Sequence, residues 1–332
     1  MWPEEDWERR TPHIELDHGD VVALSRAILD RDDVVHHELL TGGKCNTNVR
    51  LRYGDGEQVV LRVYERDRWA CERDRVIADL AAPTVPVPAV PGVLGDADAL
   101  PERLQRTLDG KPVAVFEWID GDSPIDILER ATAQQALDLA RELGSTLARI
   151  SGLSRFEDHG LLDERLDYRR RFSSHQASFV DFVDWSLEEG RTGERLGAEL
   201  SAKLRCYAHD NARRLHVLEG ECGLVHGDYK LSNILVRRES DSFRVCAVLD
   251  WEFAMAGSPL FDMAIMLRHA RRWPQGFAEG FADGFVDEGG FLPPDWRQLS
   301  ELLDVMNWCG FLNASGHRRR LFEAVRQKVR AL

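Results

Sequence analysis

The chain has 332 residues, of which 43% are hydrophobic and 30% are charged, an ordinary composition for a globular protein with room for two lobes. Its formal net charge of −14 argues against a nucleic-acid partner, because binding a phosphate backbone requires a basic surface. No apolar run is long enough to cross a bilayer, and the first residues are acidic where a signal peptide is basic, so we expect no membrane partner and a cytoplasmic location. The six cysteines lie far apart without a Cys-x-x-Cys pair, which predicts reduced thiols.

The first predicted elements are a helix and a set of hairpin strands. Apolar residues at helical spacing after an acidic start predict the helix over residues 20–31. Residues 38–64 then alternate as strands, with Gly42 and Gly43 in their first turn. These glycines, followed by Asn46, allow the backbone to approach a phosphate, and consecutive N–H groups there could cradle it. A Gly-Gly turn taken alone is more often a plain hairpin turn.

Helical and extended patterns alternate further along the chain. Thr132 and Gln135 are spaced as a capping box, and the apolar face that follows continues to Ile150. The remaining predicted features are a helix over 70–80, a proline-rich break over 83–91, a surface excursion over 95–110, a strand over 111–121, helices within 164–218 and helices over 295–330.

Two short polar motifs follow buried strands in the second half of the chain. One reads His226-Gly-Asp228 with Asn233 five residues after the aspartate, and the other reads Asp250-Trp-Glu252. Apolar residues flank each motif, which predicts polar loop tips held by buried strands. An aspartate can orient a hydroxyl group and accept its proton, while an asparagine and a second aspartate supply the hard oxygen ligands that Mg²⁺ prefers. The pattern therefore predicts phosphoryl transfer.

These motifs resemble the catalytic and metal loops of the aminoglycoside phosphotransferase-like family, the small-molecule branch of the protein-kinase-like fold. Protein kinases carry His-Arg-Asp and Asp-Phe-Gly at these places, so Gly227 and the Trp251-Glu252 pair favour the small-molecule branch. The resemblance covers roughly residues 38–270 and implies an α+β, bilobal fold. We expect an antiparallel β-sheet lobe with one helix over residues 1–118, including an N-terminal extension over 1–37, and a larger, mostly helical lobe over 119–332.

The resemblance also implies how the first lobe binds a nucleotide. Arg62 occupies the strand position where kinases place the lysine that holds the α- and β-phosphates, and Glu72 is expected to pair with it from the following helix. A solvated surface glutamate is the alternative for Glu72. Glu117 and Ile119 are expected to offer a carbonyl and an N–H to the base, and Gly42, Gly43 and Asn46 to meet the phosphates. Because main-chain contacts carry little side-chain information, ATP and GTP remain equal candidates.

In the second lobe, the resemblance assigns roles to the polar motifs. Asp228 is expected to be the base, Asn233 and Asp250 to hold Mg²⁺, and His226 to brace the loop. Lys230 matches a lysine that contacts the γ-phosphate in serine/threonine protein kinases, with a solvated loop lysine as the alternative. Asp262 is expected to bond back to the catalytic-loop backbone, whereas the role of Glu252 stays open.

The implied activity is ATP- or GTP-dependent O-phosphorylation of a small molecule. The acceptor could be an aminoglycoside-type antibiotic or a metabolite of the choline, homoserine or sugar type, and a regulatory nucleotide-binding protein without turnover is a third hypothesis. The negative charge, with Asp283, Asp287 and Glu288 expected in loops, favours a cationic, amine-bearing acceptor. The same acidity could serve solubility alone.

Overall fold

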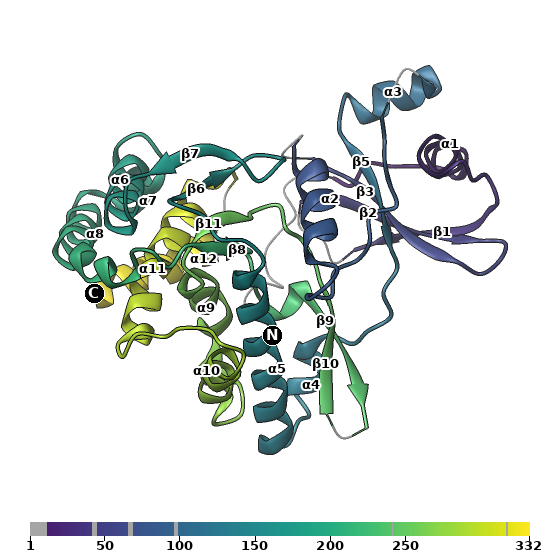
Figure 1. Ribbon diagram of the computed structural model, residues 1–332. Helices are drawn as coiled ribbons and strands as arrows, with labels where there is room; N and C mark the ends of the chain where they lie inside the picture. Colours follow the sequence, from purple (N-terminus) through teal and green to yellow (C-terminus); the bar gives the residue numbers. More distant parts are fainter. Residues whose placement is uncertain (1–11, 42–44, 66–68, 96–98, 241, 317) are drawn as a thin grey trace. The chain divides into compact units, whose positions relative to one another are not determined.

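The computed structural model describes residues 12–332 except 42–44, 66–68, 96–98, 241 and 317. The chain divides into two compact units (Figure 1). Unit 1 comprises Met1–Gly121, Asp163–Asp167 and Cys246–Glu252, and unit 2 comprises the remainder. The segment Cys246–Glu252, which the sequence places in the second lobe, groups with unit 1. Its last four residues, 249–252, are called the Asp250 loop below. Across the described residues, none of the helices combines the length and apolarity needed to span a bilayer.

Unit 1 is built on a five-stranded sheet in the order β1-β2-β3-β5-β4, in which each neighbouring pair is antiparallel (Figure 1). Alternate residues along the central strands are buried, as in β2, where Val49 and Leu51 enter the core. The strands are β1 (Val34–Leu40), β2 (Thr47–Tyr53), β3 (Gln58–Val63), β4 (Gly92–Val93) and β5 (Val113–Glu117). This antiparallel sheet confirms the fold class predicted for the first lobe.

Three described helices accompany this sheet: α1 (His18–Leu29), α2 (Ala70–Ala81) and α3 (Glu102–Leu108). Helix α1 begins with a capping box between Asp17 and Asp20. The sequence predicts a surface excursion over 95–110, and this is wrong where the structure forms α3. Its Leu104 and Leu108 are buried in the same core cluster as the strands, so the stretch contributes a helix to the hydrophobic core.

Unit 2 is mostly helical, in agreement with the predicted fold class. Thr132 and Gln135 form the predicted capping box at the start of α5, with both reciprocal hydrogen bonds present. The helices are α4 (Pro124–Leu128), α5 (Ala133–Gly152), α6 (His175–Glu188), α7 (Thr192–Leu196), α8 (Ala198–Asn211), α9 (Leu260–Leu267), α10 (Phe277–Asp287), α11 (Trp296–Asn313) and α12 (Arg319–Ala331). Short 3-10 turns occupy Ala212–Leu218, Leu231–Asn233 and Ala270–Arg272.

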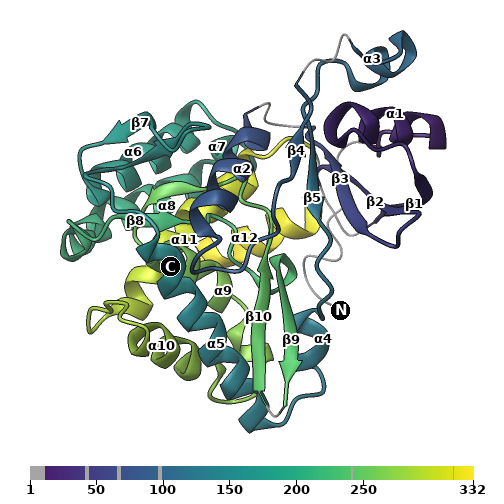
Figure 2. The same cartoon turned by 45° about the vertical axis from the view of Figure 1, so that its right-hand side comes forward.

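Helices α5 and α10 lie alongside each other in both views (Figures 1 and 2). Glycines make this close approach possible, because a Cβ at Gly144 would overlap the carbonyl oxygen of Phe281 and a Cβ at Gly284 would overlap that of Arg141. The two backbones therefore pack almost in contact, and α10 forms a fixed cover on one side of α5.

Two small sheets complete unit 2 and lead to the polar motifs. One has the order β7-β6-β11-β8, formed by β6 (His159–Leu162), β7 (Tyr168–Phe172), β8 (Gly223–Val225) and β11 (Met255–Gly257). The other pairs β9 (Ile234–Glu239) with β10 (Ser242–Val248), side by side in Figure 2. Strand β8 is fully buried and is followed by residues 226–233, called the catalytic loop below after the family motif that they resemble. Strand β10 continues into the Asp250 loop.

Candidate active site

A buried carboxyl group anchors the catalytic loop that follows β8. Asp262, on α9, accepts hydrogen bonds from the backbone N–H groups of His226 at 2.7 Å and Gly227 at 2.9 Å. This confirms the bond predicted from the sequence. Burial raises the pKa of Asp262 to about 7, against the lowering effect of these N–H donors. The start of the loop is thus fixed to α9 through one side chain.

The loop conformation depends on the residues on either side of this anchor. His226 is fully buried, and its Nδ1 accepts the N–H of Asp228 at 3.2 Å, so the ring proton lies on Nε2. Gly227 has φ of +80°, and a Cβ there would overlap the carbonyl oxygen of Phe253. The site therefore needs glycine where protein kinases carry arginine. The predicted bracing by His226 corresponds to this N–H contact.

The Asp228 carboxylate is held by two side chains of the same loop. Asn233 donates from Nδ2 to Asp228 Oδ2 at 2.9 Å and to the Asp228 carbonyl at 3.0 Å, and Lys230 Nζ lies 2.9 Å from Oδ2. Asp228 and Lys230 are partly buried, with side chains 22% and 19% exposed, so the pair is partly shielded from solvent but still accessible to it. Since the Asn233 amide nitrogen is used in these bonds, its oxygen is the group that can ligate a metal. Lys230 thus contacts the carboxylate directly.

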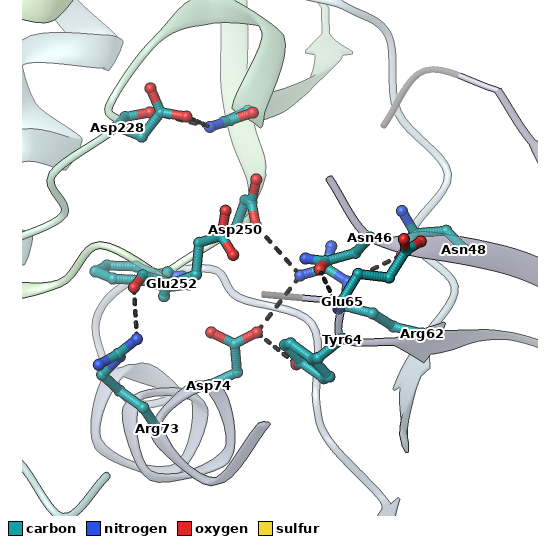
Figure 3. Close-up of polar contacts among 12 residues, drawn as sticks. Asn46, Asn48, Arg62, Tyr64, Glu65, Arg73, Asp74, Asp228, Asp250 and Glu252 are labelled. Atoms are coloured by element: carbon teal, nitrogen blue, oxygen red, sulfur yellow. Dashed lines mark hydrogen bonds and ion pairs between the residues drawn. The ribbon is translucent and has the colours of Figure 1, made fainter. Parts of the chain in front are cut away.

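The Asp250 loop of unit 1 presents the second predicted metal ligand. Asp250 has φ of +69°, a left-handed conformation that is costly for a residue with a side chain. Arg62 Nη1 lies 3.4 Å from both Asp250 Oδ1 and Asp74 Oδ2 (Figure 3). Burial opposes the charge of Arg62, but the Asp250 and Asp74 carboxylates outweigh it and raise the pKa of the guanidinium.

The predicted pairing of Arg62 with Glu72 is wrong, because Asp74 provides the carboxylate on α2. Glu72 instead contacts Arg75 at 2.8 Å, with its side chain 43% exposed. Tyr64 donates its hydroxyl to Asp74 at 2.6 Å, and burial raises the pKa of Asp74 to about 6 against the lowering effect of Arg62. Asp74 lies on the buried stripe of α2 with Cys71, Ile77 and Ala78, which is the sequence signal that could have identified it.

Asn48 is a further residue that the sequence did not single out. It sits opposite Arg62 in the β2–β3 pairing, and its Oδ1 accepts the Arg62 Nε–H at 2.9 Å. Asn46, predicted to contact the nucleotide, is buried and accepts the N–H of Glu65 at 3.2 Å. Gly42 and Gly43 lie outside the described residues. Arg62 is thus oriented from two sides, by Asn48 on β2 and by Asp74 on α2.

The strand that leads to the predicted base-binding segment ends with a defined hydrogen-bond pattern. The N–H of Glu117 donates to the carbonyl of Ala89 at 2.9 Å, and the N–H of Trp118 donates to the carbonyl of Gln58 at 3.4 Å. Peptide groups in extended chain alternate in direction. The carbonyl of Glu117 is therefore directed away from β3, on the same edge as its own N–H.

The acidic residues that were expected in loops form part of a helix and its end. Asp283 and Asp287 belong to α10, and both are paired with Arg141 on α5, at 3.0 and 3.8 Å. Glu288 follows the helix and accepts the hydroxyl of Ser145 at 2.5 Å. The predicted placement of Asp283 and Asp287 in a loop is wrong, and the cluster helps to fasten α10 to α5. Arg141 offsets only one of the three negative charges, so the attraction of cations stays a prediction.

No group of three or more His, Cys, Asp or Glu side chains in the described part of the chain could hold a metal by itself. A magnesium ion in a phosphoryl-transfer site commonly has only one or two protein ligands, with phosphates and water supplying the rest. The oxygen of Asn233 in unit 2 and the partly exposed carboxylate of Asp250 in unit 1 are each a ligand of the type that fits this chemistry.

The chain belongs to the phosphotransferase enzyme family, whose family model matches residues 36–302. This confirms the resemblance inferred from the motifs, and the protein is an enzyme of the kinase type. A curated relative, acyl-CoA dehydrogenase family member 11 of Pongo abelii, is 31% identical over 97 residues, which is 29% of this chain but only 12% of the relative. The chain thus spans about an eighth of that protein.

Two solved structures show the same fold. An aminoglycoside phosphotransferase in complex with GDP and kanamycin superimposes with a TM-score of 0.70 at 13% identity, covering 95% of this chain and 98% of that one. A putative fructosamine-3-kinase from Thermobifida fusca gives a TM-score of 0.62 at 17% identity, with 94% and 97% covered. At these identities the likeness concerns the fold, and it agrees with the predicted bilobal class.

Proposed function

We propose that this phosphotransferase transfers the γ-phosphoryl group of ATP or GTP to a hydroxyl group of a small, amine-bearing molecule. The observation that carries the proposal is the Asp228 carboxylate, fixed by Asn233 and Lys230 at the end of a buried strand. Phosphoryl transfer depends almost entirely on positioning and on charge neutralisation, and this loop supplies both.

In this mechanism Asp228 orients the acceptor hydroxyl and accepts its proton. Asp228 is suited to the task because Asn233 and Lys230 fix its carboxylate, while 22% exposure leaves it accessible. Lys230 stabilises the carboxylate before the reaction, and we assign to it the further role of offsetting charge on the transferred group. His226 and Asp262 act through the backbone, by holding the loop in place.

On the nucleotide side, Asn233 and Asp250 would hold Mg²⁺, which neutralises charge on the phosphates when it is bound. Arg62 is assigned to the α- and β-phosphates, and Asn48 and Asp74 keep its planar guanidinium oriented. The carbonyl of Glu117 and the N–H of Ile119 are assigned to the base, and Gly42, Gly43 and Asn46 to the phosphate-binding turn. Main-chain recognition leaves both purine nucleotides as candidates.

The acceptor is assigned by charge and by likeness. A net charge of −14 favours the approach of cations. The structural neighbours include an enzyme bound to kanamycin and a putative fructosamine kinase. The acidic groups of α10 support the assignment only in part, because Arg141 pairs with two of them and offsets one of their charges. A metabolic kinase with a choline-, homoserine- or sugar-like acceptor is the alternative.

The test is a screen of hydroxyl compounds coupled to the release of ADP or GDP, with Asp228→Asn as the blank. Aminoglycosides, amino sugars, glycated amines, choline, homoserine and neutral sugars form the panel. We expect the wild-type protein to turn over amine-bearing compounds and not the others. We expect no turnover by the Asp228→Asn variant. Turnover confined to neutral or anionic alcohols would remove the amine assignment, and equal release by both proteins would remove the assigned role of Asp228.

A further inference from the structure

Helix α2 makes two separate attachments to the Asp250 loop within unit 1. Asp74 holds Arg62, and Arg62 in turn reaches the Asp250 carboxylate at 3.4 Å. The preceding residue, Arg73, donates from Nη2 to the backbone carbonyl of Glu252 at 2.5 Å. Figure 3 shows these contacts on the two sides of the same loop. Consecutive helix residues thus hold the loop by its side chain and by its backbone.

The backbone of this loop needs such support. Asp250 has φ of +69°, in the left-handed region, which is disfavoured for a residue with a side chain even though aspartate tolerates it better than most, so surrounding contacts help to hold it. Before it, the N–H of Val248 donates to the carbonyl of Pro86 at 2.8 Å. After it, Trp251 is buried and Arg73 fixes the carbonyl of Glu252. The strained residue is therefore fixed on both sides, and Arg73 provides the second attachment.

Arg73 is suited to this contact rather than to general surface electrostatics. Arg73 is buried, with 5% of the residue exposed. Its positive charge is one of the contributions that lower the pKa of Asp74 against the larger raising effect of burial. A planar guanidinium can hold a carbonyl in a fixed direction, whereas an ammonium group is a point charge on a flexible stem. Arg75, on the same helix, is partly exposed, and its described contacts are with two acidic neighbours on α2, Glu72 and Asp79.

We propose that Arg73 is a positioning residue for phosphoryl transfer, which keeps Asp250 in the conformation that presents its carboxylate to Mg²⁺. This inference rests on the proposed function, because it takes Asp250 as a metal ligand. Residues that orient a metal ligand without touching the metal are important for binding. Their removal typically lowers metal affinity or activity by roughly 10- to 100-fold. Arg73 would act in this way through the loop backbone.

The experiment measures ADP binding to the full chain by calorimetry over a series of Mg²⁺ concentrations. Arg73→Met removes the donor and keeps an apolar stem, Arg75→Met is the matched control on the same helix, and Asp250→Ala is the reference for loss of the ligand. The Mg²⁺ midpoint is the concentration that gives half of the full increase in ADP affinity. In Arg73→Met we expect this midpoint to rise roughly 10- to 100-fold. ADP affinity without Mg²⁺ should stay within about twofold, and Arg75→Met should match the wild type.

The outcomes separate this inference from the proposed function. An unchanged Mg²⁺ midpoint in Arg73→Met, together with a lower melting temperature, would show a purely structural role and overturn the inference, while a shifted midpoint in Asp250→Ala would leave the metal role intact. An unchanged midpoint in Asp250→Ala would overturn both. If Arg73→Met does not fold, Arg73→Lys carries the test: a smaller upward shift supports the inference, and a wild-type midpoint contradicts it.

Discussion

Asp228 is held by hydrogen bonds that an asparagine could largely keep, which makes Asp228→Asn a clean test of its chemistry. The variant retains the side-chain shape but cannot accept a proton, so we expect turnover to fall roughly 100- to 10,000-fold. The nucleotide dissociation constant should change little, since the assigned nucleotide contacts lie on other residues. Steady-state kinetics and a separate binding titration measure the two effects. A variant with near-normal turnover would contradict the assignment.

Asp262 offers a second test, in which pH reports on a buried group. Its pKa of about 7 in the folded chain lies above the ordinary value of 3.8, so its contribution to stability is largest at low pH and is lost as the pH rises from about 4 through 7. Asp262→Asn lacks this titration and can accept only one of the two loop N–H groups through its single oxygen. We expect the variant to unfold at lower urea, with a larger stability deficit at pH 5 than at pH 8. An identical deficit at both pH values would contradict the buried titration.

At the scale of elements, the contact between α5 and α10 depends on the absence of side chains. Gly284→Ala places a Cβ against the carbonyl of Arg141, so the helices must separate, at a cost of about 1–3 kcal/mol or more. Gly310→Ala is the control, because this α11 position has open space around the added carbon and alanine favours helices by about 1 kcal/mol. Urea unfolding should show a loss in the first variant and no loss in the second. Equal effects would mean that the close packing does not matter.

Helix α2 allows a matched pair of carboxylate substitutions. Asp74→Asn weakens the hold on Arg62, and we expect it to raise the nucleotide KM several-fold, whereas Glu72→Gln, which disturbs only an exposed contact with Arg75, should leave the KM unchanged. Initial-rate kinetics at saturating acceptor measure this difference. The reverse ranking would restore Glu72 as the residue that organises Arg62.

The sequence predicted elements well where the local pattern decides the structure. The capping box of α5 needs only Thr132 and Gln135, and both hydrogen bonds form. Helix α3 was missed because its amphipathic pattern spans only seven residues, and what stabilises it is the burial of Leu104 and Leu108 against distant strands. Short elements that depend on tertiary contacts give little signal in the sequence.

The polar motifs indicated where the candidate catalytic residues lie in the chain, but they did not predict how side chains pair. Asp74 and Glu72 are two residues apart on one helix, and only the phase of the buried stripe decides which one faces Arg62. In the same way, the pairing of Asp283 with Arg141 depends on α5 and α10, which are far apart in sequence. The roles assigned to Asp228, Asn233 and Asp250 stay predictions until the variants are measured.

For the whole molecule, two buried histidines whose tilted rings lie in close contact in unit 2 make stability depend on pH. The rings of His159 and His175 lie 3.2 Å apart between centroids, and burial lowers their pKa values to about 4 and about 3. The unfolded chain takes up these protons near the ordinary value of 6.5. The stability that both histidines contribute is therefore complete above pH 6.5 and decreases as the pH falls toward 3.

His175→Phe removes one of these titrations and keeps an aromatic ring in the buried position. The free energy of unfolding of the wild type minus that of the variant should decrease as the pH falls from 7 to 4. Only the wild type loses stability through the protonation of this group. Urea titrations at four pH values across that window measure the slope. A difference that is constant with pH would show that His175 is not buried in its neutral form.

The glycine of the catalytic loop also limits how this enzyme can be controlled. Protein kinases order their activation loops when an added phosphate group pairs with arginine. At position 227 the backbone is left-handed and the carbonyl of Phe253 fills the space of a Cβ, so an arginine cannot be accommodated there. A switch in which an arginine at this position pairs with an added phosphate is therefore not available to the chain. The loop is held instead by the Asp262 carboxyl group, which accepts the N–H groups of His226 and Gly227.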